Sequence, residues 1–182
     1  MITTEDIERV DIIDEQGNVI ETMLKSESHA KGLLHKCVIS EVVDSQGRWL
    51  LVKQAGDRQD AGQYVSPVGG HVSAGETEEE ALRREAEEEV GLVGDLKFEY
   101  INRAVFNRFV IGRQENHLFV MYNIFSDEVP KLGVESVDYT YFTESELKDE
   151  LHKNPQMFGD AFHFVIKQFF PHLVTEETPS HV

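Results

Sequence analysis

The chain has 182 residues, 40% of them hydrophobic, and its 34 acidic side chains outnumber the 17 basic ones to give a formal net charge of −17. This length and composition suit one globular domain with a sizeable core better than two small domains. The acidic balance would repel bare nucleic acid and anionic membrane surfaces, so we expect neither as a partner.

The first part of the sequence predicts two β-hairpins with a short helix between them. The segment VDIIDEQGNVIETM (10–23) alternates around a turn, and KCVISEVVDSQGRWLLVKQ (36–54) repeats the pattern around a second turn that contains Gly47. Between them, SESHAKGLLHK (26–36) predicts one or two helical turns capped by Ser26 or Ser28. Residues 1–36 would thus form an N-terminal hairpin and a short helix.

The middle of the chain predicts a loop, a strand and a helix. AGDRQDAGQ (55–63) is a polar loop, and YVSPVGG (64–70) is a short strand that ends in a glycine pair. Thr77 and Glu80 have the spacing of a capping box, which places the start of a helix at Thr77. Gly91 would end this helix after Val90.

The second half predicts three strands and then two helices. The strands are LKFEYINRAVFNRFV (96–110), ENHLFVMYNIF (115–125) and VDYTYF (137–142). TESELKDELHK (143–153) and PQMFGDAFHFVIKQFF (155–170) predict helices, the second with an aromatic face for the core or a homodimer contact. Residues 175–182 are expected to fray. We expect one domain over 1–182, with a mixed sheet covered on both faces.

The sequence gives no sign of secretion or of a membrane span. No apolar run reaches the roughly 18 residues that a spanning helix needs, and the first residues lack the blocks of a signal peptide. The single cysteine, Cys37, excludes an intrachain disulfide and lies in an apolar strand, so we expect a buried, inert thiol. We therefore expect a cytoplasmic protein.

Eight glutamates lie between Glu76 and Glu89, and the helix sorts them onto different faces. At about 100° per residue, Glu85, Glu88 and Glu89 share one arc, where like charges repel. Arg84 would relieve Glu88 and pair with Glu80 four residues before it. Divalent metal is the natural counter-charge for such an arc, because Mg²⁺ takes oxygen ligands and reverses the local electrostatic effect of the acidic chain.

The stretch from Gly70 to Leu92 resembles the Nudix box, a signature with fixed spacing. The matching positions are Gly70, Glu76, Arg84, Glu85, Glu88, Glu89, Gly91 and Leu92. Ala86 stands where a larger aliphatic residue is usual, and it is still apolar. The resemblance implies a Nudix-type α/β/α sandwich with a mixed central sheet and a catalytic loop-helix-loop.

The resemblance also implies a reaction and roles for the matching residues. Glu85, Glu88, Glu89 and the carbonyl of Gly70 would hold Mg²⁺ or Mn²⁺. Arg84 would orient Glu85, and Glu76 would support the loop. The implied enzyme is a pyrophosphohydrolase that cleaves a diphosphate bond in a nucleoside diphosphate derivative or similar small metabolite, with the metal neutralising charge and activating water.

The box leaves the general base and the substrate contacts open. Glu115, Glu135 and Asp138 are candidates outside it for the base or an extra ligand. Cationic side chains that could meet phosphates are Arg103, Arg108 and Arg113, and aromatic ones that could stack a base are Tyr64, Phe106 and Phe109. Residues of these types are more often ordinary core or surface residues, so the structural interpretation stays open for each of them.

Outside the box, the layout of residues 9–125 resembles the Nudix subgroup that includes isopentenyl diphosphate isomerase. These isomerases combine histidines, a cysteine before the Gly-His pair and two glutamates on a later strand. His35 and His71 match, His29 lies near a matching place, Gly69 replaces the cysteine, and Glu115 has His117 in its partner's position. The losses remove the proton-transfer pair, while His35, His71 and His117 could bind a second metal or make polar contacts.

Three functions therefore stay open, with the hydrolase ahead. The second is an isopentenyl diphosphate isomerase-like isomerase, which the glycine at position 69 disfavours. The third is a non-catalytic Nudix sensor that binds a nucleotide. The intact set of Glu85, Glu88 and Glu89 disfavours this reading, because a binding module has no need of all three carboxylates.

Overall fold

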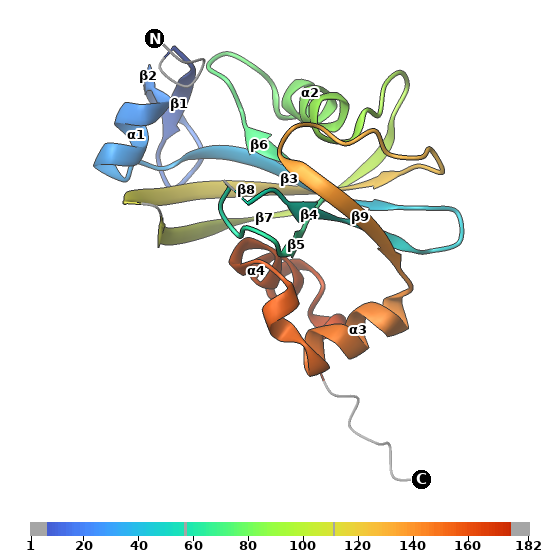
Figure 1. Cartoon of the computed structure of the whole chain (residues 1–182). Coiled ribbons are helices and arrows are strands. Elements are labelled where there is room, and N and C mark those ends of the chain that lie inside the picture. The colour runs from blue at the N-terminus through green and yellow to red at the C-terminus, as the bar shows by residue number, and fades with distance from the viewer. Residues whose placement is uncertain (1–6, 57, 111, 176–182) are drawn as a thin grey trace, which may run out of the picture.

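The computed structural model describes residues 7–56, 58–110 and 112–175, which form layers of helices and a sheet (Figure 1). The strands are β1 Arg9–Ile13, β2 Val19–Leu24, β3 His35–Val43, β4 Trp49–Gln54, β5 Tyr64–Val65, β6 Val68–His71, β7 Lys97–Val110, β8 Arg113–Phe125 and β9 Ser136–Phe142. The helices are α1 Lys25–Lys31, α2 Glu78–Val90, α3 Glu144–Lys153 and α4 Asp160–Phe169, with short 3₁₀ turns at Pro155–Met157 and Pro171–Leu173.

β3 organises the sheet because it pairs with strands from every part of the chain. It runs parallel to β8 along its whole length and antiparallel to β6, β1 and β4. β7 and β8 form a long antiparallel hairpin, and β9 pairs with β4. The sheet is therefore mixed, as the sequence predicted.

Alternation along the strands divides the core into two layers. On β3, Cys37 and Ile39 join the cluster that packs beneath α3 and α4, whereas Val38 and Val42 join the cluster beneath α2. Figure 1 shows α2 on one face of the sheet, and α3 and α4 on the opposite face. This three-layer arrangement confirms the predicted α/β/α sandwich.

Two local predictions need correction, and a third lies mostly outside the described residues. The stretch YVSPVGG forms two strands, β5 and β6, and not one, because Ser66 and Pro67 between them belong to neither. Proline lacks the amide hydrogen that a strand donates to its neighbour. The last helix is divided, since a 3₁₀ turn precedes α4. Residues 1–6 and 176–182, which include most of the predicted frayed tail, lie outside the described residues.

The short helix α1 begins without the predicted serine cap. Leu24 is its N-cap residue, and both Ser26 and Ser28 lie inside the helix. The backbone amide of Lys25 donates to the carbonyl of Glu8 at 2.8 Å, so the residue before β1 satisfies one of the amides that have no partner within the helix. Within the described residues, no helix is long and apolar enough to cross a membrane.

Candidate active site

Local sequence signals fix both ends of the acidic helix α2. Thr77 accepts a hydrogen bond from the Glu80 amide while the Glu80 carboxylate accepts one from the Thr77 amide, which confirms the predicted capping box. Gly91 ends the helix with φ 68°, in the left-handed region that favours glycine. The loop before β9 then covers this end, because the amide of Gly133 donates to the carbonyl of Glu89 at 2.8 Å.

Arg84 joins the helix to the strand and loop that precede it. Its guanidinium donates to both carboxylate oxygens of Glu76 at 2.9 Å, to Glu85 at 2.6 Å and to the carbonyl of His71 at 2.9 Å. Glu88 lies 3.6 Å away, as predicted, but Glu80 is used by the cap, so the predicted Glu80–Arg84 pair is wrong. Arg84 thus fixes the position of Glu85.

Gly70 and Glu85 fit together only because the glycine has no side chain. Gly70 lies in β6 opposite Val38 of β3, and a Cβ atom built on it would overlap the carboxylate of Glu85. The side chain of Glu85 is buried, and burial raises its pKa to about 7 although Arg84 lowers it. A buried carboxylate therefore lies directly against the backbone of the glycine pair.

Glu89 and Glu135 extend the acidic group beyond the helix. Burial raises the pKa of Glu89 to about 7, and the next largest contribution is repulsion from Glu135, followed by that from Glu85. Glu135 pairs with Arg58 at 2.9 Å. Glu88 is more open, with 58% of its side chain exposed. The structure therefore brings the three box glutamates together and adds Glu135 to them.

These acidic groups line a pocket of about 1130 Å³. Its lining includes Glu85, Glu88, Glu89 and Glu135, and also the aromatic residues Phe106 and Phe119. The two aromatic rings stack on each other, with their centroids 5.0 Å apart. The pocket thus combines a crowded group of carboxylates with apolar lining, which suits a cation together with an anion that carries a larger organic group.

Glu115 lines the same pocket, but cations hold it in place. Arg108 donates to one of its oxygens at 2.8 Å, while Arg113 at 3.0 Å and Gln59 at 2.6 Å donate to the other. These contacts lower the pKa of Glu115 despite its burial. A carboxylate with both oxygens occupied and a lowered pKa is poorly placed to accept a proton from water.

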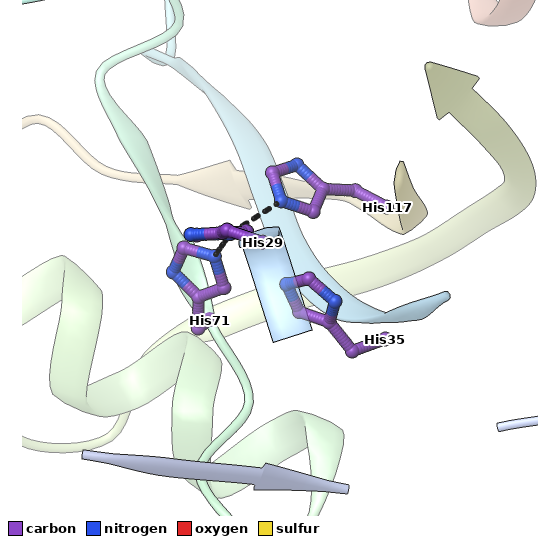
Figure 2. Close-up of side chains that lie close together, drawn as sticks. All are labelled: His29, His35, His71 and His117. Atoms are coloured by element: carbon purple, nitrogen blue, oxygen red, sulfur yellow. Dashed lines mark hydrogen bonds between the residues drawn. The ribbon is translucent and has the colours of Figure 1, made fainter. Parts of the chain in front are cut away.

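Four histidines lie close together, as Figure 2 shows, and two of them, His71 and His117, line this pocket. His29 comes from α1, His35 from the start of β3, His71 from the end of β6 and His117 from β8. One ring nitrogen of each lies within 4.8 Å of the others. Burial lowers the pKa of His29 to about 4 and that of His117 to about 3, and the neighbouring His35 lowers both further. The rings are therefore neutral, which is the form that binds metals.

The structure separates the other sequence candidates. Arg108, Arg113 and Phe106 line the pocket, whereas Arg103 and Phe109 are not among its lining residues. Tyr64 packs edge-on against Phe142, and Asp138 lies exposed on β9 opposite Lys53. Cys37 is buried as predicted, and burial raises the pKa of its thiol. Sequence reasoning missed Arg58 as a pocket residue, because nothing in the polar loop signals the contact that Arg58 makes with Glu135.

Comparison with known proteins agrees with this geometry. The model of the NUDIX domain matches residues 34–164 of the chain. The chain belongs to the Nudix family. An isopentenyl-diphosphate Delta-isomerase of Serratia proteamaculans is 27% identical over 159 residues, which cover 86% of this chain and 88% of that protein. An uncharacterised Nudix hydrolase of Yersinia pestis is 40% identical over 90 residues, which cover 48% of this chain and 49% of the relative.

Solved structures share the fold at low sequence identity. A crystal structure from Deinococcus radiodurans aligns with a TM-score of 0.70 at 23% identity, covering 88% of this chain and 98% of the other. The family match and the hydrolases among the relatives support the predicted enzyme class, so this Nudix protein is a hydrolase of acid anhydrides. Nudix hydrolases generally use divalent metal ions, which is consistent with the donor set at α2.

Proposed function

We propose that this Nudix hydrolase cleaves the diphosphate bond of a nucleoside diphosphate derivative or a similar small metabolite, with Mg²⁺ or Mn²⁺ as cofactor. The observation that carries the proposal is the close fit of the buried Glu85 carboxylate against Gly70, beside Glu88 and Glu89 in one pocket. Oxygen ligands in this number suit a hard divalent cation that keeps waters for exchange with phosphate.

The residues of the chain divide the work around the bound substrate. Glu85, Glu88, Glu89 and the carbonyl of Gly70 would hold the metal, which supplies charge neutralisation for the diphosphate and a more acidic bound water. Arg84 keeps Glu85 in position through its bonds to Glu76 and the His71 carbonyl. The stacked rings of Phe106 and Phe119 would contact the organic group.

We infer that Glu135, and not Glu115, takes the proton from the attacking water. Glu135 lines the pocket with Glu89 and is close enough to raise its pKa, while Glu115 has both oxygens bound by Arg108, Arg113 and Gln59. Glu135→Gln should lower kcat by about 10²–10⁴-fold with little change in KM, as expected for loss of a general base. Glu115→Gln should lower kcat far less. Equal kcat losses in two folded variants would reject this assignment.

An isomerase is the second candidate, because relatives named isopentenyl-diphosphate isomerases match most of the chain. Isomerisation moves protons between carbons and needs a donor and an acceptor on opposite sides of the substrate. Gly69 offers no titratable group where the isomerase pattern has a cysteine, and a side chain there would make only ordinary contacts with Ile39 and Val38. The space for a thiol exists, but the chain lacks the thiol.

The experiment that tests the proposal is product analysis over a panel of phosphate compounds. Nucleoside triphosphates, nucleotide sugars, dinucleotides and isopentenyl diphosphate would be incubated with the protein and Mg²⁺ or Mn²⁺. We expect one class to be cleaved at its diphosphate bond, with the two halves of the substrate recovered as separate phosphate-bearing products, and we expect this cleavage to be lost when the metal is chelated. Conversion of isopentenyl diphosphate to its isomer without phosphate release would favour the isomerase, and nucleotide binding without turnover would favour the sensor.

A further inference from the structure

The four-histidine cluster has more nitrogen lone pairs than its own hydrogen bonds can satisfy. The Nε2 atom of His29 lies 3.3 Å from Nε2 of His117 and 3.2 Å from Nε2 of His71. A neutral ring has one N–H, so a proton on His29 can serve only one of these two neighbours. Three ring nitrogens thus meet at one point with too few protons to pair them all.

His35 supplies the second observation. Its Nδ1 atom lies 2.8 Å from the carbonyl of Leu33, so Nδ1 carries the proton and Nε2 keeps its lone pair. His35 is fully buried, and among the described residues its Nε2 atom has no hydrogen-bond partner. A ring held by a carbonyl on one nitrogen, with the other nitrogen free, is the usual arrangement of a metal-ligating histidine. Without a ligand, such a nitrogen has lost its hydrogen bonds to water and gained none in the protein, which destabilises the fold.

No carboxylate joins this cluster within the described part of the chain. Glu115, two residues from His117 on β8, is held by Arg108 and Arg113 instead. The donor set therefore consists of four imidazole nitrogens, whereas the α2 site offers carboxylate and carbonyl oxygens. In this respect the chain departs from the mixed histidine and glutamate set of the isomerase subgroup.

We propose that His29, His35, His71 and His117 form a second metal site, and that their all-nitrogen donor set selects zinc-, cobalt- or nickel-type ions against Mg²⁺ and Mn²⁺. Imidazole ligands suit these ions, while Mg²⁺ and Mn²⁺ prefer oxygen, and Mn²⁺ is the weakest binder in the divalent transition series. His71 and His117 line the large pocket, which gives an ion a route of entry. This nitrogen site is separate from the proposed hydrolysis, because that reaction needs only the metal held by the oxygen ligands of α2 and Gly70.

A metal ion at this site would also stabilise the fold. Its ligands come from α1, β3, β6 and β8, so a bound ion would fasten the N-terminal helix to three strands of the sheet. Binding to the native state alone raises the melting temperature by mass action. We therefore expect metal-stripped protein to melt at a higher temperature after one equivalent of Zn²⁺ is added than it does without added metal.

The test uses the full chain, stripped of metal with a chelator and titrated with Co²⁺, whose visible absorption reports four-coordinate nitrogen ligation. We expect one Co²⁺ per chain in this spectrum, displaced by Zn²⁺ and unaffected by excess Mg²⁺. His35→Gln should weaken Zn²⁺ binding by at least about 100-fold, since loss of a ligand exceeds the 10–100-fold effect of losing an outer-shell partner. His152→Gln, on the exposed face of α3, is the matched control and should bind as the wild type does.

A second variant tests selectivity directly. His117→Glu introduces an oxygen donor and should shift the ratio of Mn²⁺ to Zn²⁺ affinity toward Mn²⁺. Glu89→Gln should keep the Co²⁺ spectrum, so a failure of the hydrolase proposal would leave this result unchanged. The proposal is overturned if folded His35→Gln keeps the spectrum, if Mg²⁺ or Mn²⁺ displaces Co²⁺, or if the wild type binds no Co²⁺.

Discussion

Glu89→Gln is expected to lower hydrolysis on the order of 10³-fold, which corresponds to the several kcal/mol that a bound metal contributes to the transition state. The substitution keeps the size of the side chain and removes the charge that faces Glu85 and Glu135. The rate would be measured with saturating Mg²⁺ on the substrate class that the panel identifies.

The same variant should remain folded, which separates lost catalysis from lost structure. The pKa of Glu89 in the folded protein is raised to about 7. The stability that protonated Glu89 contributes is therefore present below the pKa that this side chain has in the unfolded chain, and it is lost as the pH rises through 7. At pH 8 without metal, Glu89→Gln should therefore be at least as stable as the wild type.

Two controls sharpen the result. Glu87→Gln changes an exposed glutamate on the same helix and should keep full activity. Added Mg²⁺ should raise the melting temperature of the wild type more than that of Glu88→Gln/Glu89→Gln, because binding stabilises the native state. Unchanged activity in Glu89→Gln, or equal Mg²⁺ shifts in both proteins, would place the catalytic metal elsewhere.

The acidic helix could be predicted because its signals are local. The cap at Thr77, the stop at Gly91 and the convergence of Glu85 with Glu89 all depend on residues within one helix of the chain. Spacing at 3.6 residues per turn is enough to place such side chains on a common face. Gly70 is different, because the resemblance implied a role for its carbonyl, whereas only the structure shows that the Glu85 carboxylate leaves no room for a side chain there.

The partners of that helix could not be predicted, because they depend on tertiary packing. The spacing of four favoured Glu80 as the partner of Arg84, but the loop folds back and presents Glu76 and the His71 carbonyl instead. Side chains on a helix point toward its N-terminus, which directs Arg84 at this loop. Likewise, sequence spacing left His29 uncertain, and only the packing of α1 against the sheet brings its ring to His71 and His117.

The end of β6 links the two donor sets. The carbonyl of His71 accepts from Arg84, which positions the oxygen ligands, while its ring belongs to the nitrogen cluster. In the two proposed assignments, the oxygen set suits Mg²⁺ or Mn²⁺, whereas the nitrogen set disfavours both of these ions. The adjoining glycine pair keeps the backbone close to Glu85 at the same place.

Arg84→Met is expected to destabilise the metal-free protein by about 2–3 kcal/mol at pH 8, less than the roughly 3–5 kcal/mol of a fully buried pair, because solvent screens a guanidinium that is partly exposed. The change leaves the buried carboxylate of Glu85 without its cation and removes the fork that binds Glu76. Denaturant unfolding in the presence of a chelator measures the effect. Arg83→Met is the matched control, because Arg83 lies on the same helix as Arg84 but packs over the ring of Phe98 in β7, 5.0 Å from its centroid, and is not bound to Glu85 or Glu76 in these contacts.

The pH dependence of this loss identifies its cause. Glu85 has a raised pKa of about 7, and removing Arg84 raises it further, so the stability that Glu85 contributes is present at low pH and is lost as pH rises through the folded-state value. The pKa of Glu76 is lowered with the help of Arg84, so removing Arg84 also takes away stability that ionised Glu76 contributes. This part of the loss is constant at every pH above the pKa that Glu76 has in the unfolded chain. The free energy of unfolding of the variant should therefore lie below that of the wild type by a constant amount near pH 5 and by a growing amount toward pH 9. A difference that does not change over this range would mean that Arg84 stabilises the loop through Glu76 alone and leaves the charge of Glu85 unaffected.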